Sequence, residues 1–137
     1  MNNEYTKKLL KRFQNPKFVK DVKNADAVGE VGSAGCGDIM KLSMKIDSKT
    51  KKIKDIGFKT FGCGAAIAAS DVVCELSKGK TLDEARKITK DDIVKELGGM
   101  PRIKIHCSIL GIEALSKAIE NYEENGKEDS KKEVKKE

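Results

Sequence analysis

An alternation of apolar and polar residues near the middle of the chain constrains the fold most tightly. Apolar side chains occupy every second position from Met40 to Ile46, with Lys or Ser between them, which is the period of a β-strand with one buried face. Residues 53–61 repeat this period after a polar connection at 47–52. The two runs predict an antiparallel hairpin, and the Gly-rich residues 27–34 before it can form an edge strand or a loop.

Helical spacing of apolar residues marks three other segments. Residues 5–13 form a short leading helix, the alanine-rich residues 64–78 form a second, and a long third helix begins near Lys104. In each, apolar residues recur at intervals of three and four. Thr81 and Thr89 each start a capping-box pattern and predict two short helices between the second and third.

These elements predict an α+β fold, a three-stranded antiparallel sheet with helices packed on it. A chain of 137 residues is long enough to bury one sizeable core, so we expect a single compact domain. We place that domain at residues 1–124. Residues 125–137 alternate Lys with Glu and contain one apolar residue, Val134, so we expect a charged, disordered tail there.

Composition argues against two classes of partner. The net charge is +6, but Lys outnumbers Arg 25 to 3 and only 4% of residues are aromatic, so nucleic-acid binding is not expected. The longest unbroken apolar stretch, Ala65 to Ala69, is far too short for a membrane span. Residues 1–13 contain no apolar h-region, so no secretory signal is expected and the predicted location is the cytoplasm.

Three of the four cysteines are candidate functional residues because they stand at predicted element boundaries. Cys36 and Cys63 each lie between two glycines, and Cys107 follows the only histidine, His106. In a reducing compartment such cysteines favour metal binding or thiol chemistry over disulfides. The chain contains no Cys-x-x-Cys, which argues against zinc ribbons, thioredoxin-like motifs and covalent haem attachment.

These residues form a ligand set for zinc or iron–sulfur chemistry. Cys63 would directly precede one helix and Cys107 would lie in the first turn of another, where a thiol pKa falls from about 8.5 toward ~3.5 to 7.5. With His106 and the carboxylate of Asp38 the site offers five donors, whereas a binuclear cluster needs about four. A spare, weaker donor can exchange in and out, which would make the cluster labile.

The fourth cysteine, Cys74, has a different environment. It lies in the middle of the alanine-rich helix, beside Val72 and Val73. Free cysteine is among the most buried residue types, so we expect Cys74 to serve packing.

At these residues the sequence resembles the IscU/NifU-type iron–sulfur cluster assembly scaffolds. The resemblance runs from about Tyr5 to Tyr122, and its matching segments are 34–42, 58–68, 79–85 and 104–108. It implies a compact α+β scaffold on which a 2Fe-2S cluster is built from iron and sulfane sulfur and then passed to acceptor apoproteins. It also implies that Zn²⁺ can occupy the same site.

The resemblance implies roles and partners as well. Cys36, Cys63, His106 and Cys107 match the ligand positions, and Asp38 matches the acid associated with metal binding and cluster lability. Cys107 also matches the cysteine that accepts a persulfide from a cysteine desulfurase. The other implied partners are iron or electron donor proteins and acceptor apoproteins.

One segment departs from the family pattern. Residues 100–104 read Met-Pro-Arg-Ile-Lys, where family members often read Leu-Pro-Pro-Val-Lys, the segment that a dedicated Hsp70-type chaperone recognises. This difference argues against handoff to such a chaperone.

The sequence leaves two alternatives to a non-enzymatic assembly scaffold. The first is a zinc-binding structural or regulatory module that uses the same Cys, His and Asp side chains. The second is a thiol enzyme such as a sulfurtransferase, with Cys107 as nucleophile and His106 as base. Adjacent residues rarely orient for mutual proton transfer, which disfavours the enzyme.

Overall fold

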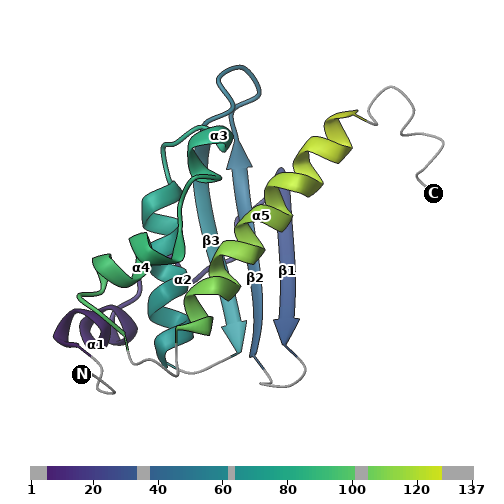
Figure 1. Cartoon of the computed structure of the whole chain (residues 1–137). Helices are drawn as coiled ribbons and strands as arrows, with labels where there is room; N and C mark the ends of the chain where they lie inside the picture. Colours follow the sequence, from purple (N-terminus) through teal and green to yellow (C-terminus); the bar gives the residue numbers. More distant parts are fainter. Residues whose placement is uncertain (1–5, 34–37, 62–63, 101–104, 128–137) are drawn as a thin grey trace.

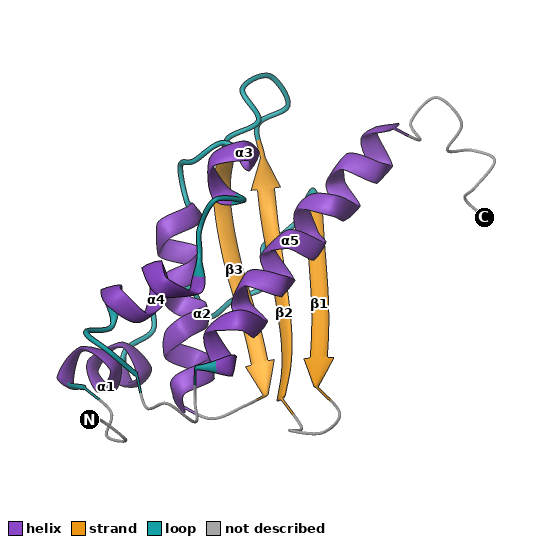
Figure 2. Cartoon of the chain, viewed as in Figure 1, coloured by secondary structure: helices purple, strands orange, loops and turns teal. Residues whose placement is uncertain are grey.

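The computed structural model describes residues 6–33, 38–61, 64–100 and 105–127, with the side chains of 33, 38, 106, 107 and 125–127 left out. Its elements form one sheet and a set of helices (Figures 1 and 2). In chain order they are α1 (Lys7–Gln14), β1 (Ala27–Ser33), β2 (Asp38–Ile46), β3 (Ile53–Phe61), α2 (Gly64–Ser77), α3 (Leu82–Ala85), α4 (Lys90–Glu96) and α5 (His106–Lys127).

The sheet has the order β1-β2-β3, and both pairs are antiparallel. The predicted hairpin is therefore confirmed, and the Gly-rich segment that the sequence left open forms the edge strand β1. In the β1–β2 pair Ala27 lies opposite Met44, and in the β2–β3 pair Leu42 lies opposite Phe58. The predicted α+β fold, with three antiparallel strands and packed helices, is confirmed.

The core lies between the sheet and the helices α2 and α5. Met40, Leu42, Met44 and Ile46 are all buried, as their alternation predicts, because every second side chain of β2 points to the helical face. The opposite face of the sheet is crossed by the segment after α1, in which the Val22 N–H donates to the Ser43 hydroxyl at 3.0 Å.

Helix α2 is buried on more sides than the sequence predicts. The predicted stripe is confirmed by buried Ala65, Ala69, Val72 and Val73, but Ser70 and Asp71 outside it are buried too. The helix packs against α1, α4 and α5 as well as β3, so it has little solvent-facing surface.

Cys74 is fully buried in α2, as predicted. Burial raises the pKa of its thiol well above the usual value, because an apolar environment disfavours the thiolate. Cys74 therefore serves packing.

Local signals fix the short helices as expected. Thr81 caps α3 in a capping box with Glu84, and Thr89 caps α4 in a second box with Asp92. Gly79, after α2, has φ +86°, a left-handed conformation that glycine adopts without strain.

Helix α5 is longer than predicted. It begins at His106 and runs to Lys127, three residues into the predicted tail, and residues 128–137 of that tail lie outside the described part. Its C-terminal half is held by an ion pair from Arg86 to Glu123, and Arg86 also pairs with Asp83 of α3. Lys51, in the β2–β3 connection, also contacts it, with its ammonium 5.3 Å from the centre of the Tyr122 ring.

Candidate metal centre

The described elements that flank the candidate cysteines all end at one end of the molecule. Strand β1 ends at Ser33, β2 begins at Asp38 and β3 ends at Phe61, while α2 begins at Gly64 and α5 at His106. Figure 1 shows these five ends together, on the side away from the β2–β3 connection. The fold therefore brings the flanks of all three candidate cysteines to the same region.

The sheet register makes two of these flanks direct neighbours. Ser33 lies opposite Asp38 in the β1–β2 pair, and Ile39 lies opposite Phe61 in the β2–β3 pair. The described residues on either side of the segment that contains Cys36 are thus paired with each other. The same strand β2 pairs with the residue that stands two positions before Cys63.

Met40 connects the sheet to the beginnings of both helices. Its sulfur lies 3.5 Å from the Ser70 hydroxyl of α2. Its Cε would lie 3.9 Å from a methyl group placed on Gly111 of α5. Met40 is two residues after Asp38, so these contacts hold α2 and α5 beside the start of β2.

The first turn of α5 is fixed by two local hydrogen bonds. The buried Ser108 hydroxyl donates to the Ile105 carbonyl at 2.7 Å, and the Ser108 N–H donates to the same oxygen at 3.0 Å. His106 and Cys107 lie between these residues. The two bonds therefore fix the helical backbone at both candidate donors.

The candidate ligands that the structure describes lie at the ends of helices and strands, as predicted. The distances between the ligand atoms fall outside the described part of the chain. Cys36 and Cys63 lie outside the described residues. Asp38 is the first residue of β2, and His106 and Cys107 are the first two residues of α5, but their side chains are not among those described. That the three thiols share one coordination sphere stays a prediction.

Two helix N-termini point toward this end of the molecule. Helix α2 begins directly after Cys63, and Cys107 lies in the first turn of α5, as the sequence predicted. Unpaired N–H groups at a helix start carry partial positive charge and stabilise a thiolate. That the two thiols are stabilised as thiolates stays a prediction.

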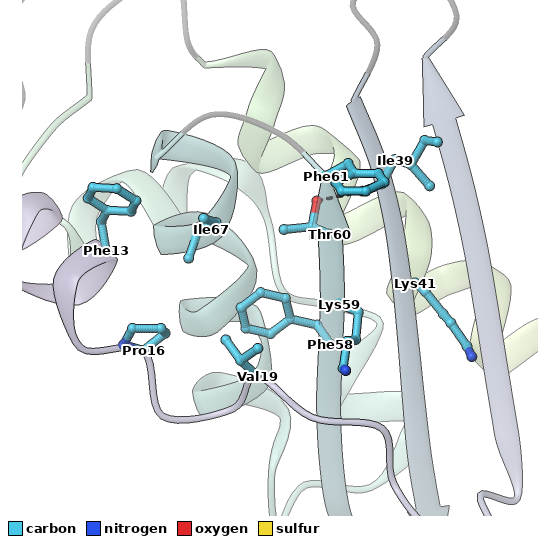
Figure 3. Close-up of a pocket in the computed structure, with 10 residues that line it drawn as sticks. All are labelled: Phe13, Pro16, Val19, Ile39, Lys41, Phe58, Lys59, Thr60, Phe61 and Ile67. Carbon is cyan, nitrogen blue, oxygen red and sulfur yellow. Dashed lines mark hydrogen bonds between the residues drawn. The ribbon is translucent and has the colours of Figure 1, made fainter.

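An apolar groove of about 520 Å³ lies beside this end. Phe13 of α1, Val19, Ile67 of α2 and the strand residues Ile39 and Phe61 line it (Figure 3). Phe61 is 76% exposed. This groove was not predicted from the sequence, although Ile39 and Phe61 break the phase of the two strand patterns. Apolar residues out of phase in this way indicate an apolar group on the polar face of the sheet.

Two features are absent from the described residues. No group of three or more His, Cys, Asp or Glu side chains in the described ranges is placed to hold a metal ion. Within those same ranges, no helix has the length and apolar character needed to cross a bilayer.

The fold and the positions of the candidate donors define a class, an α+β protein with a candidate metal centre at one end of its sheet. Residues 4–129 match the family model described as the NifU-like N terminal domain. The match covers most of the chain, so this chain belongs to the NifU-like N-terminal domain family.

Similar sequences are named as IscU or NifU proteins. The "Iron-sulfur cluster assembly scaffold protein IscU 1" of Archaeoglobus fulgidus is 48% identical over 131 residues, which cover 95% of this chain and 84% of that protein. The scaffold protein IscU of Aquifex aeolicus is 45% identical over 122 residues, covering 89% and 78%. The "Nitrogen fixation protein NifU" of Azotobacter chroococcum is 48% identical, and the match covers 87% of this chain but 38% of that longer protein.

Solved structures show the same fold. A putative iron–sulfur cluster assembly scaffold protein from Fervidobacterium islandicum has a TM-score of 0.71 at 23% identity, with 84% of this chain and 96% of that chain covered. A NifU-like N-terminal protein from Brucella abortus has a TM-score of 0.69 at 21% identity, with 87% and 94% covered.

Proposed function

We propose that this chain is a scaffold on which an iron–sulfur cluster is assembled and from which the cluster is transferred to acceptor apoproteins. The observation that carries the proposal is the 48% identity, across 95% of the chain, to a protein named as such a scaffold. The positions of Asp38, His106 and Cys107 at the ends of their elements are consistent with it.

In this proposal the cluster is cargo of the 2Fe-2S type. Cys36, Cys63, His106 and Cys107 hold it, and Asp38 is the weaker donor that exchanges with one of them. Thiolates suit iron–sulfur clusters, and a labile fifth donor lowers the barrier to release. The same donors would accept Zn²⁺, which favours tetrahedral sites of Cys and His.

Sulfur reaches the site by persulfide transfer from a cysteine desulfurase. The Cys107 thiolate attacks the terminal sulfur of the donor's persulfide, a new S–S bond forms on Cys107, and the donor cysteine leaves as a thiolate. No net oxidation occurs in this step. Cys107 accepts sulfur covalently, and the chain by itself is not a turnover catalyst.

The proposal includes several partners and a location. A cysteine desulfurase supplies sulfur, iron or electron donor proteins supply the other components, and apoproteins receive the cluster. The sequence of residues 100–104 argues against an Hsp70-type chaperone. The cytoplasm is the proposed location.

Anaerobic incubation of the purified chain with ferrous iron, cysteine and a cysteine desulfurase tests the function. A scaffold develops a visible sulfide-to-iron charge-transfer band and then passes iron and sulfide to an added apo-ferredoxin. A zinc module stays colourless under the same conditions. A sulfurtransferase turns over a thiol acceptor without iron.

Four alanine variants test the proposed ligands in that assay. We expect Cys36→Ala, Cys63→Ala and Cys107→Ala each to abolish the stable visible band, because each removes one thiolate from the coordination sphere. Cys74→Ala is the matched control, since Cys74 is buried in α2. It should retain the band.

Two results would contradict the ligand set. One is a stable band of wild-type intensity in any of the first three variants. The other is loss of the band in Cys74→Ala while that variant remains folded by circular dichroism.

A further inference from the structure

The aromatic ring of Phe13 lies directly against the first residue of α2. A methyl group built on Gly64 would lie 3.2 Å from Cγ and from Cδ1 of the Phe13 ring, which is tighter than ordinary van der Waals contact. Gly64 is therefore in close contact with α1. It also follows Cys63 directly, and the two share a peptide unit that fixes their Cα separation.

A buried carboxylate holds the chain on both sides of Phe13. Asp71 of α2 is 0% exposed. It accepts hydrogen bonds from the backbone N–H groups of Lys17 and Phe18, both at 2.8 Å, and from the Arg12 guanidinium at 3.0 Å. Phe13 lies between these attached residues in the sequence, so α2 itself fixes the backbone that carries the ring.

The other end of α1 is attached to a different element. The Thr6 hydroxyl, which caps α1, donates a hydrogen bond to the Leu97 carbonyl after α4. Leu9, between the two attachments, is fully buried. Because α1 is fixed at both ends, the backbone that carries the Phe13 ring cannot slide along α2 without breaking a buried contact.

We propose that Phe13 is a positioning residue of the cluster site, acting through Gly64 on Cys63. This inference rests on the proposed function for its cluster readout. The ring fixes the backbone at the start of α2 and excludes water from one side of it, so it sets where the Cys63 sulfur is presented and how accessible it is. Its effect is local to Cys63 and does not extend to Cys107, which α5 carries.

The test compares Phe13→Ala with two matched variants. Phe13→Tyr keeps the ring, and Leu10→Ala removes an apolar side chain of equal exposure, since Leu10 and Phe13 are both 38% exposed on α1. After reconstitution, loss of the visible band is followed with a chelator present. Mutation of residues that support metal ligands typically lowers metal affinity about 10–100-fold. Phe13→Ala should therefore lose its cluster about tenfold faster than wild type. Phe13→Tyr and Leu10→Ala should follow the wild-type rate.

A second readout needs no cluster. In the metal-free proteins, alkylation of Cys63 and Cys107 by iodoacetamide is timed by peptide mass spectrometry. Phe13→Ala should change the ratio of the two rates by about tenfold, because only the environment of Cys63 is altered. A merely structural role would change both rates together and leave the ratio unchanged.

A double-mutant cycle distinguishes a specific contact between Phe13 and Gly64 from a general loss of folding. Gly64→Ala keeps every existing group and adds a methyl that crowds the ring, so it should also change the alkylation ratio. In the double variant Phe13→Ala with Gly64→Ala, the methyl occupies space that the ring has left, and the two effects should be strongly non-additive.

The outcomes separate this inference from the proposed function. If wild type and Leu10→Ala form cluster but Phe13→Ala matches them in loss rate and alkylation ratio, the positioning role is overturned and the scaffold function stands. If wild type forms no cluster, the scaffold function fails. The alkylation ratio and the double-mutant cycle then decide the role of Phe13 alone.

Discussion

Asp71 stabilises the fold through hydrogen bonds that depend on its negative charge. It is fully buried, and its donors are two backbone N–H groups and the guanidinium of Arg12. An ionised carboxylate is tolerated in such a place only when it is fully paired. Arg12 is the more exposed partner and also pairs with Glu75. Burial acts to lower the pKa of Arg12, but the hydrogen bonds that its guanidinium donates to Asp71 and Glu75 raise that pKa overall.

We expect Asp71→Asn to lower the free energy of unfolding by about 1.5–3 kcal/mol, because the buried hydrogen bonds from Arg12, Lys17 and Phe18 lose their charged acceptor. Urea unfolding at neutral pH measures this change. Glu75→Gln is the control, since Glu75 is a half-exposed partner of the same Arg12. It should cost less than about 1 kcal/mol. Equal losses in the two variants would show that burial of the Asp71 carboxylate contributes nothing.

No sequence pattern marks Asp71 in this role. A lone acidic residue within a helix normally faces solvent, and its partners lie more than fifty residues away in the chain. The three candidate thiols present the converse case. Their flanking glycines and the single histidine are visible in the sequence, whereas the distances between their sulfurs depend on long-range packing that local patterns do not encode.

At the scale of elements, β1 and α5 approach so closely that one position of β1 must be glycine. A methyl group on Gly29 would lie under 3.0 Å from the backbone of Ala114 and of Ala118. These are backbone atoms of a long helix, so they cannot rotate away as a side chain would. Asn121 adds a hydrogen bond at 2.7 Å from its side-chain amide to the Val28 carbonyl.

Gly29→Ala should therefore destabilise the protein by about 1–3 kcal/mol, the usual cost of overpacking a well-filled core. Thermal unfolding measures the change. Val28→Ala, one residue away on the opposite face of the strand, should cost under about 1 kcal/mol. A Gly29→Ala variant as stable as wild type would mean that α5 can move away from the sheet without loss.

Gly29 also explains why β1 was harder to predict from the sequence than the other elements. Strands β2 and β3 are evident because apolar residues alternate through most of their length, and α2 to α4 are bounded by glycines and caps. Strand β1 stayed ambiguous because glycines at 29 and 32 remove the alternation, yet the one at 29 is there because α5 lies on it. Tertiary packing therefore obscured the local signal of β1.

At the scale of the whole molecule, carboxylates determine how stability depends on pH. A hydrogen bond from Lys20 lowers the pKa of Asp55 below its ordinary 3.8, and the Thr81 backbone N–H lowers the pKa of Glu84 below its ordinary 4.5. A group whose folded pKa is depressed contributes stability above its unfolded pKa and loses it as the pH falls through the folded value.

We therefore expect the free energy of unfolding to be nearly constant just above pH 4.5 and to fall as the medium is acidified below it. The positive net charge of +6 acts in the same direction, because protonated carboxylates leave the lysines unbalanced. Urea midpoints measured at intervals from about pH 6 to pH 3 test this. Glu84→Gln should show a smaller loss than wild type. Midpoints that rise on acidification would refute the assignment.

The contacts that hold α5 have a consequence for release of the cluster. Arg86 and Lys51 hold its C-terminal half at the end of the molecule opposite the candidate site, so a local opening around the cargo leaves those bonds intact. Such an opening requires only part of the global unfolding free energy. An emptied molecule then retains most of its core and is ready to be loaded again.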